Sequence, residues 1–307
     1  MKKVSVVVPV YFNEGSIPIL YDRLQNIGNE LEQIDLDLEL IFVDDGSGDG
    51  SLRELLKVKK ADDSVKVIKL TRNFGATHAS KTGFQFVTGD CFMILAADLQ
   101  DPPETIIEMA KAWLSGAKFV ICERESRDDP LTTRLFASLY YKIIQKFVVH
   151  GYPEGGFDLA LMDKSMLPYM QNNGKSFYTP LYAYWLGFKP IVLKYQRAKR
   201  EHGKSKWTFG KKVNAFLDVF LGFSRAPIRL ISFIGLVVSI LSFGYGALIA
   251  INALFGNFIV PGFATIAVLI TFLLGLVILM LGVIGEYLWR IFDEVTDRPE
   301  SVIDEIY

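Results

Sequence analysis

A long apolar run near the end of the chain constrains its fold more than any other feature. Fifty-six consecutive residues, 230–285, contain no Asp, Glu, Lys or Arg. A helix that crosses a bilayer needs about 20 apolar residues, so the run is long enough for two spans. Residues 256–262, which include two Gly, one Asn and one Pro, mark a short loop between them. We therefore predict a two-helix transmembrane hairpin at 228–290 rather than a buried hairpin in a water-soluble core.

Basic residues flank this hairpin and predict its orientation. Arg225 and Arg229 precede the first span, Arg290 follows the second, and the loop between the spans carries no charge. Because Lys and Arg are enriched at the cytoplasmic ends of membrane helices, we expect both ends of the hairpin in the cytoplasm. The chain before the hairpin and a C-terminal tail, 291–307, would then be cytoplasmic too. The first apolar run, 4–8, is too short for a signal peptide, and the expected location is the inner (plasma) membrane as a multi-pass protein.

The first 122 residues alternate strand-like and helix-like segments. The strand-like runs are residues 4–8, 36–43, 65–70, 91–97 and 119–122. Strands that alternate with helices of this length are typical of βαβ units and a mostly parallel sheet. The sequence therefore predicts an α/β, Rossmann-like domain, which we place at 1–207.

Polar side chains follow every one of these strands. They are Asn13 and Glu14, Asp44 and Asp45, Arg72 and Asn73, Asp98 and Gln100, and Arg124. Since ligands bind beyond the carboxyl ends of the strands in open α/β sheets, these side chains predict one site. Carboxylates and an amide suit a divalent cation, and arginines suit a diphosphate. The loop 45–50 lacks G-x-G-x-x-G and has two carboxylates before its first glycine, which argues against a dinucleotide-binding fold.

Three motifs carry a resemblance to a known family. They are P-V-Y-F-N-E at 9–14, V-D-D-G-S at 43–47 and A-D-L-Q-D-P-P at 97–103. They resemble the nucleotide-sugar half of family 2 glycosyltransferases with the GT-A fold. More narrowly, they are similar to the polyprenyl-phosphate branch, which includes dolichol-phosphate mannose synthases and bactoprenol glucosyltransferases. The resemblance implies nucleotide contacts for Pro9, Tyr11, Glu14, Asp45 and Asp98, and Mg²⁺ or Mn²⁺ held by Asp98 and Gln100.

The chain departs from the family pattern at Ala96. The family usually has D-x-D here, and the first carboxylate is missing. Three consequences stay open: weaker metal binding, a metal shell completed by the diphosphate and Gln100, or a degenerate member without catalytic activity.

Asp158 is the one acid in the middle of the strand-like run 155–163, which ends at Asp163. Burying a lone carboxylate is costly, so this residue needs either a function or an edge that faces water. The family has an acid beside the acceptor phosphate, and the resemblance implies that role for Asp158, which we expect to be catalytic together with Asp98. Its chemistry stays open between a general base, an orienting group, a metal ligand and a stabiliser of positive charge. A phosphate monoester with a second pKa near ~6 needs little deprotonation.

Basic residues that would bind phosphate occur in two places. Arg124 and Arg127 belong to a charged loop, where solvated surface arginine is the alternative. The segment 197–207 resembles the R-x-x-G-x-S-K loop of the family, which closes on the diphosphate. That resemblance implies phosphate contacts for four residues, namely Arg200, His202, Ser205 and Lys206. A basic patch that meets anionic lipid headgroups is the other interpretation of this segment.

Two amphipathic stretches precede the hairpin, at 131–149 and 208–227. Each has an apolar face at helical spacing, which fits a helix in the membrane interface. For 131–149, a helix packed on the domain core would show the same pattern.

The resemblance implies that this protein transfers a sugar, from UDP-glucose or a related UDP-hexose, to polyprenyl (undecaprenyl) phosphate at the cytoplasmic membrane face, with inversion. It also implies a homo-oligomer, with a tetramer as one possibility, and the formal net charge of -1 suggests no nucleic-acid-binding surface. A processive polysaccharide synthase is one rival, although its Q-x-x-R-W segment is missing from the sequence. The other rival is a non-catalytic membrane scaffold, motivated by Ala96.

Overall fold

The computed structural model describes residues 1–125, 131–172, 174, 179–197, 220–221, 223–224, 226–255, 262–296 and 298–307. The chain divides into two compact units. The first comprises Met1–Asp218 together with Arg298–Tyr307, and the second is Val219–Asp297. The C-terminal residues therefore belong to the same unit as the N-terminal domain.

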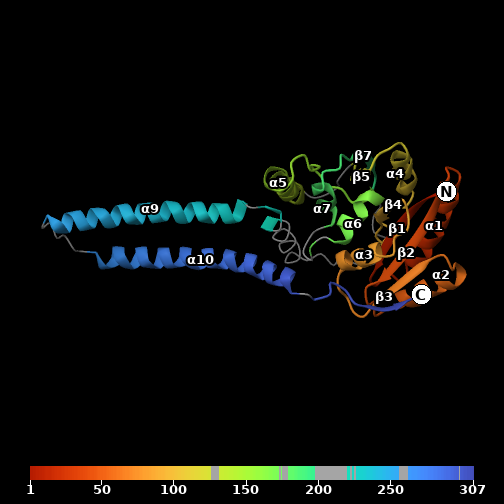
Figure 1. The fold of residues 1–307 in the computed structure, drawn as a ribbon, viewed down its shortest axis with the longest axis horizontal. Coiled ribbons are helices and arrows are strands. Elements are labelled where there is room, and N and C mark those ends of the chain that lie inside the picture. The colour runs from red at the N-terminus through yellow and green to blue at the C-terminus, as the bar shows by residue number, and fades with distance from the viewer. Residues whose placement is uncertain are drawn as a thin grey trace. The chain divides into compact units, whose positions relative to one another are not determined.

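A mostly parallel sheet organises the first unit (Figure 1). In the described residues the strand order is β7-β5-β6-β4-β1-β2-β3-β8. The parallel pairs are β4 with β1, β1 with β2, β2 with β3, and β5 with β7. Strand β6 is antiparallel to both β4 and β5, and β8 is antiparallel to β3. The strands are β1 (Lys2–Val10), β2 (Leu36–Asp44), β3 (Lys66–Leu70), β4 (Cys91–Ile94), β5 (Phe119–Arg124), β6 (Leu159–Asp163), β7 (Ile191–Tyr195) and β8 (Ile303–Ile306). The predicted α/β class and mostly parallel sheet are confirmed.

Helices cover both faces of this sheet. They are α1 (Ile17–Glu32), α2 (Ser51–Ala61), α3 (Ala76–Phe84), α4 (Thr105–Leu114), α5 (Leu131–Phe147), α6 (Leu167–Gln171) and α7 (Thr179–Trp185). Side chains alternate between the faces of a strand. On β1, Val6 and Val8 therefore join the core cluster that includes residues of α1 and α4, whereas Val7 points to α3.

Close packing of α3 depends on a glycine. A Cβ on Gly83 would overlap Cγ1 of Val7 and lie 3.2 Å from Cγ2 of Val43. Both valines are fully buried, so they have little room to move away. Helix α3, which carries part of the site described below, is therefore fixed directly against β1 and β2.

One buried carboxylate links neighbouring strands at the side of the sheet away from their carboxyl ends. Glu39 on β2 accepts hydrogen bonds from Ser5 Oγ (2.5 Å), Lys66 Nζ (2.8 Å) and both the backbone and hydroxyl of Thr88 (2.9 and 2.7 Å). Burial alone would raise the pKa of Glu39. The hydrogen bonds from Lys66, Ser5 and Thr88 outweigh it and lower the pKa to about 2.

The C-terminal residues form the edge strand β8 and contact α3. Tyr307 and Val67 exchange backbone hydrogen bonds of 2.8 and 3.3 Å. Glu300 pairs with Lys81 Nζ at 2.6 Å and lies 3.5 Å from His78 Nδ1. From the sequence, residues 291–307 are expected to be a tail, and this strand is not predicted. Its pairing explains why these residues belong to the first unit.

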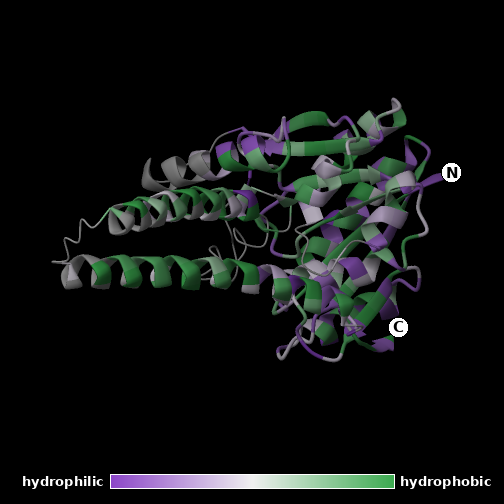
Figure 2. Cartoon of the chain, turned by 60° about the vertical axis from the view of Figure 1, so that its left-hand side comes forward, coloured by the Kyte–Doolittle hydropathy of each residue, from purple (hydrophilic) through white to green (hydrophobic). Residues whose placement is uncertain are grey.

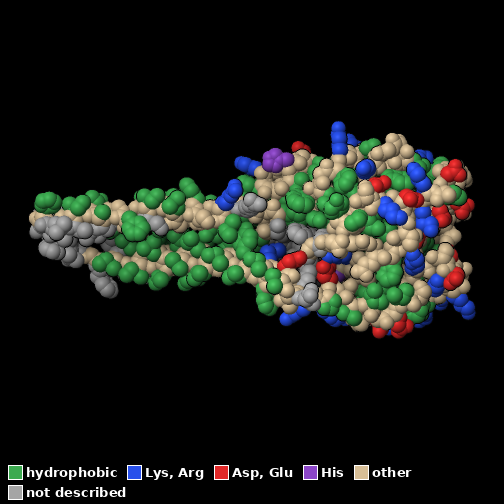
Figure 3. All heavy atoms as spheres, viewed as in Figure 1, with side chains coloured by type: hydrophobic (Ala, Val, Ile, Leu, Met, Phe, Trp, Pro, Cys, Tyr) green, Lys and Arg blue, Asp and Glu red, His purple; other side chains and the backbone are tan. Residues whose placement is uncertain are grey.

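The second unit contains two long helices, α9 (Ala226–Leu254) and α10 (Phe263–Val295). Within them, Ala226–Tyr245 and Phe272–Val295 are long and apolar enough to cross a membrane. Hydrophobic residues line both helices and are exposed along them (Figures 2 and 3). This arrangement confirms two apolar C-terminal helices, and the second continues past residue 290.

The two predicted amphipathic segments are described to different extents. Helix α5 spans much of 131–149, and the Gln145 side chain at its C-terminal end donates to the Tyr152 carbonyl at 2.7 Å. Ile144 is fully buried, so this end of α5 packs on its own unit. Of the segment 208–227, residues 208–219, 222 and 225 lie outside the described residues. An interfacial position for either segment stays a prediction.

Replacing Glu39 with Gln is expected to destabilise the protein in a pH-dependent way. The folded-state pKa lies below the ordinary value of 4.5, so the stabilisation is fully present above pH 4.5 and is lost as the pH falls toward about 2. The pH-dependent part of the loss should reach at most about 3 kcal/mol at pH 7. Unfolding of the detergent-solubilised full chain, followed by tryptophan fluorescence from pH 7 to pH 3, measures it. A constant difference between the two proteins across this range would contradict the assignment.

Replacing Glu300 with Gln is expected to lower the unfolding temperature, because Lys81 loses a partly buried partner, at a cost of about 1–2 kcal/mol. Glu305→Gln is the matched control, since Glu305 lies on the exposed edge of β8, and it should change little. Equal effects of the two substitutions would show that the Glu300 contact does not hold α3.

Candidate active site

The loops after β1 and β2 lie against each other. The Phe12 N–H donates to Ser47 Oγ at 3.2 Å, and Glu14 accepts from the Gly50 N–H at 3.1 Å. Glu14 also pairs with Arg53 Nη2 at 2.5 Å. The structure thus brings two of the predicted strand ends together, as parallel strands require.

Two further residues predicted to contact a nucleotide lie at the end of β1. Pro9 lines a cavity beside the sheet. The Tyr11 ring meets the Phe12 ring edge-on, with centroids 4.7 Å apart, and Phe12 is 49% exposed with a positive φ of 59°. The exposed Phe12 ring, with the partly buried Tyr11 ring beside it, gives a planar base a surface on which to stack at the carboxyl edge of the sheet.

Asp45 is buried and its carboxylate is engaged by the loop after β3. It accepts hydrogen bonds from Asn73 Nδ2 (2.9 Å), the Phe74 N–H (2.7 Å) and the Gly75 N–H (2.9 Å). Burial nevertheless leaves its pKa raised. Because Gly75 precedes α3, Asp45 fixes the start of that helix relative to β2.

A second group of charged side chains surrounds Asp158. Arg124, the last residue of β5, donates from Nε and Nη2 to the two carboxylate oxygens of Asp158, each at 2.6 Å. This bidentate ion pair joins β5 to the start of β6. Burial opposes ionisation of Asp158, but the hydrogen bonds and charge of Arg124 dominate and lower its pKa. Asp158 is therefore a carboxylate at neutral pH.

Tyr195 and Arg197 extend this group from the end of β7. The Tyr195 hydroxyl lies 2.9 Å from Asp158 Oδ2 and 2.7 Å from Asp101 Oδ1. Burial, then the two carboxylates, raises the pKa of Tyr195, so its hydroxyl keeps the proton that it donates. Arg197 Nε lies 3.0 Å from Asp101 Oδ1, and Arg197 Nη2 donates to Gln100 Oε1 at 3.3 Å.

Asp98 and Gln100 lie in the turn between β4 and α4. The Gln100 N–H donates to Asp98 Oδ1 at 3.3 Å, and Leu99 between them has a positive φ of 60°. No group of three His, Cys, Asp or Glu side chains in the described parts of the chain is arranged to hold a metal. However, Mg²⁺ is commonly bound through one or two carboxylates together with substrate phosphates. The oxygen donors of Asp98 and Gln100 fit a cation of this kind, and Ala96 adds none.

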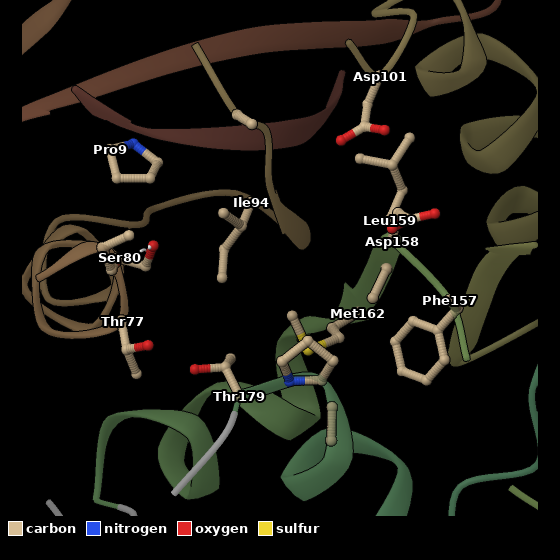
Figure 4. Close-up of a pocket in the computed structure, with 15 residues that line it drawn as sticks. Pro9, Thr77, Ser80, Ile94, Asp101, Phe157, Asp158, Leu159, Met162 and Thr179 are labelled. Atoms are coloured by element: carbon tan, nitrogen blue, oxygen red, sulfur yellow. Dashed lines mark hydrogen bonds between the residues drawn. The ribbon is translucent and has the colours of Figure 1, made fainter. Parts of the chain in front are cut away.

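A cavity of about 220 Å³ adjoins the carboxylates (Figure 4). Asp101 and Asp158 lie at one end of it, and Pro9, Thr77 and Ser80 lie on the other side. Ala96 is one of the lining residues. The position that holds the first acid of D-x-D in the family thus borders this cavity with a methyl group.

The structure brings some of the sequence-predicted residues close together, and others lie outside the described residues. Five predicted positions, Arg127, Arg200, His202, Ser205 and Lys206, lie outside the described residues. Tyr195 and Arg197 were not selected from the sequence, and Asp101, which follows Asp98 and Gln100 in the 97–103 motif, was given no contact of its own. The signal was available for two of them, because Tyr195 ends β7 and Arg197 follows it, as Arg124 ends the parallel neighbour β5.

Comparisons with known proteins place this chain among glycosyltransferases. Residues 5–173 match the family model Glycosyl transferase family 2. The bactoprenol glucosyl transferase of Shigella phage SfII is 34% identical over 98% of this chain and 97% of its own length. The undecaprenyl-phosphate 4-deoxy-4-formamido-L-arabinose transferase of Photorhabdus laumondii is 32% identical, over 100% and 94%. Among solved structures, S. aureus TarS 1–349 in complex with UDP-GlcNAc covers 66% of this chain and 60% of its own, with 16% identity and a TM-score of 0.44.

Breaking the Arg124–Asp158 pair is expected to destabilise the first unit. Arg124→Met leaves a partly buried carboxylate without its main partner, at a cost of about 2–4 kcal/mol. The double variant Arg124→Met/Asp158→Asn should recover much of this loss, because no unpaired charge remains. Urea unfolding of the full chain in detergent gives the coupling free energy. Additive effects of the two substitutions would show that the pair is not coupled in solution.

Proposed function

Because the chain belongs to glycosyl transferase family 2, we propose that it transfers a hexose from UDP-glucose or a related UDP-sugar to undecaprenyl phosphate, with inversion at the anomeric carbon. Full-length similarity to transferases named for bactoprenol and undecaprenyl phosphate supports the acceptor class. The observation that carries the proposal is the cluster of Arg124, Asp158, Tyr195, Asp101 and Arg197 beside Asp98 and Gln100, at the edge where parallel strands end.

The nucleotide would bind at the ends of β1 and β2. Tyr11 and the exposed Phe12 offer aromatic surface for the base, and Pro9 and Glu14 border the same edge. We assign Asp45 a positioning role, because its carboxylate already accepts three hydrogen bonds from the loop before α3. A nucleotide bound at this edge would contact a loop whose conformation Asp45 fixes.

Asp98 and Gln100 would hold the divalent cation, Mg²⁺ or Mn²⁺. When bound, such a cation neutralises the charge that develops on the departing diphosphate. In this chain, the Asp98 carboxylate and the Gln100 amide oxygen would place the cation at the end of β4. Phosphate contacts by Arg124, Arg127, Arg200, His202, Ser205 and Lys206 stay predictions.

Asp158 would act as a carboxylate that orients the acceptor and stabilises positive charge at the anomeric carbon. Its lowered pKa makes it a weak base. The acceptor phosphate, with a second pKa near ~6, is already largely dianionic at neutral pH. One phosphate oxygen forms the new bond to the anomeric carbon through an oxocarbenium-like state. The bond from this carbon to the diphosphate breaks, and its electron pair leaves with UDP, so no proton transfer is needed.

The apolar helices α9 and α10 support a membrane location, because the acceptor's phosphate lies at the headgroup level while its tail stays in the bilayer. We propose a multi-pass inner-membrane protein with a cytoplasmic catalytic domain, since Arg225, Arg229 and Arg290 flank the spans. Amphipathic segments at the interface and a homo-oligomer belong to the same proposal.

Transfer of labelled sugar from a panel of UDP-sugars to undecaprenyl phosphate in detergent tests this function. We expect labelled lipid with Mg²⁺ or Mn²⁺ and none with EDTA. Asp98→Asn and Asp158→Asn should each reduce transfer by about 100-fold or more, since each removes a charge aimed at the transition state. Glu108→Gln is the control, because Glu108 is an exposed acid on α4 that pairs with Lys111. UDP binding without transfer from any donor would contradict the proposal and favour a non-catalytic member, with Ala96 as its cause.

A further inference from the structure

The guanidinium of Arg197 lies among oxygens that come from separate parts of the sheet. Its Nε is 3.0 Å from Asp101 Oδ1, and its Nη2 donates to Gln100 Oε1 at 3.3 Å. Its Nη1 is 4.0 Å from Asp158 Oδ1. Gln100 and Asp101 belong to the turn after β4, Asp158 precedes β6, and Arg197 follows β7. A positive charge of the chain itself therefore lies within 4.0 Å of oxygens from Gln100, Asp101 and Asp158.

One of these oxygens is also a proposed ligand of the divalent cation. Gln100 Oε1 is the amide oxygen that the proposed cation site would use with Asp98. A guanidinium hydrogen-bonded to that oxygen and a divalent cation bound to it would be like charges a few ångströms apart, which repel. The arrangement around Arg197 thus opposes metal binding as long as Arg197 keeps this contact.

We infer that Arg197 is an internal competitor of the divalent cation. Without donor, its guanidinium holds Gln100 and Asp101, and the protein binds Mg²⁺ or Mn²⁺ weakly. When donor and cation bind together, Arg197 leaves Gln100 and pairs with the diphosphate, a ligand that suits its planar fork. This inference rests on the proposed function, and it makes Arg197 a positioning residue that couples metal binding to donor binding.

The small number of acidic ligands makes this coupling effective. Ala96 supplies no ligand oxygen and borders the cavity instead. Asp98 is then the one carboxylate of the proposed pair, so the diphosphate and waters would complete the shell. A competitor at Gln100 removes one of the two protein ligands whenever the diphosphate is missing.

Binding of Mn²⁺ alone to the full chain in detergent, measured by the loss of free Mn²⁺ signal in electron paramagnetic resonance, tests the inference. Arg197→Gln is expected to bind Mn²⁺ at least about 5-fold more tightly than the parent protein without nucleotide, a typical size for coupling between ligands. Arg23→Gln is the matched control, since Arg23 also pairs with a carboxylate, Glu104, but on the surface. It should leave Mn²⁺ affinity unchanged.

Two further variants separate competition from a structural role. Arg197→Lys keeps a positive charge near Asp101 but lacks the fork that spans Asp101 and Gln100, so it too should bind Mn²⁺ more tightly. Adding Gln100→Ala to Arg197→Gln should abolish the gain, because the released ligand is then gone. Unchanged or weaker Mn²⁺ binding in both Arg197 variants would overturn the inference.

Addition of UDP provides the last comparison. UDP should tighten Mn²⁺ binding more in the parent protein than in Arg197→Gln, because the parent alone has a competitor to displace. An equal effect of UDP on the two proteins would overturn the coupling. Failure of sugar transfer with these Mn²⁺ results intact would refute the proposed function and leave the competition established. Normal transfer with no change in Mn²⁺ binding would refute the competition alone.

Discussion

The bidentate ion pair between Arg124 and Asp158 holds the candidate site together. It ties the end of β5 to the start of β6, which runs antiparallel to both of its neighbours, β4 and β5. The Tyr195 hydroxyl connects Asp158 to Asp101, and so connects β7 to the turn that carries Gln100. Because Arg124 keeps Asp158 ionised, the cluster presents fixed negative charge at neutral pH. This electrostatic arrangement is consistent with the orienting role that we propose for Asp158.

Two buried carboxylates, Glu39 on β2 and Asp45 directly after this strand, support the site through the strands and loops around it. Glu39 joins β1, β2 and β3 near the opposite edge, and Asp45 holds the loop that begins α3. Glu300, from the C-terminal segment, contacts α3 through Lys81. Helix α3 is thus fixed at its start by Asp45 and along its length by Gly83 and Glu300, and it presents Thr77 and Ser80 to the cavity. The walls of the site depend on contacts between residues far apart in the sequence.

The sequence predicted those features that follow from a local pattern. Strand-like runs ending in polar residues located Asp45, Asp98 and Arg124 at one edge, and the charge-free run predicted α9 and α10. The hydrogen-bond partner of each side chain was harder to predict, because it depends on residues that are distant in the sequence. For Asp45, no local pattern indicated that the Phe74 and Gly75 N–H groups donate to its carboxylate. Arg197 stood in a run of basic residues, and its contact with Gln100 spans 97 positions. Strand β8 is short and mostly polar or charged at its centre, so no periodicity distinguished it from a tail.

Hydrogen exchange of backbone amides in the full chain, with and without UDP and Mg²⁺, tests most directly whether the carboxyl edge of the sheet is the donor site. If the donor binds there, exchange should slow at 9–14, 44–50 and 97–104 and stay unchanged at β8, which lies at the edge of the sheet beside β3. Protection confined to the opposite ends of the strands, at 33–36, 62–66 and 115–118, would contradict it. Unchanged exchange throughout at saturating UDP would contradict it as well.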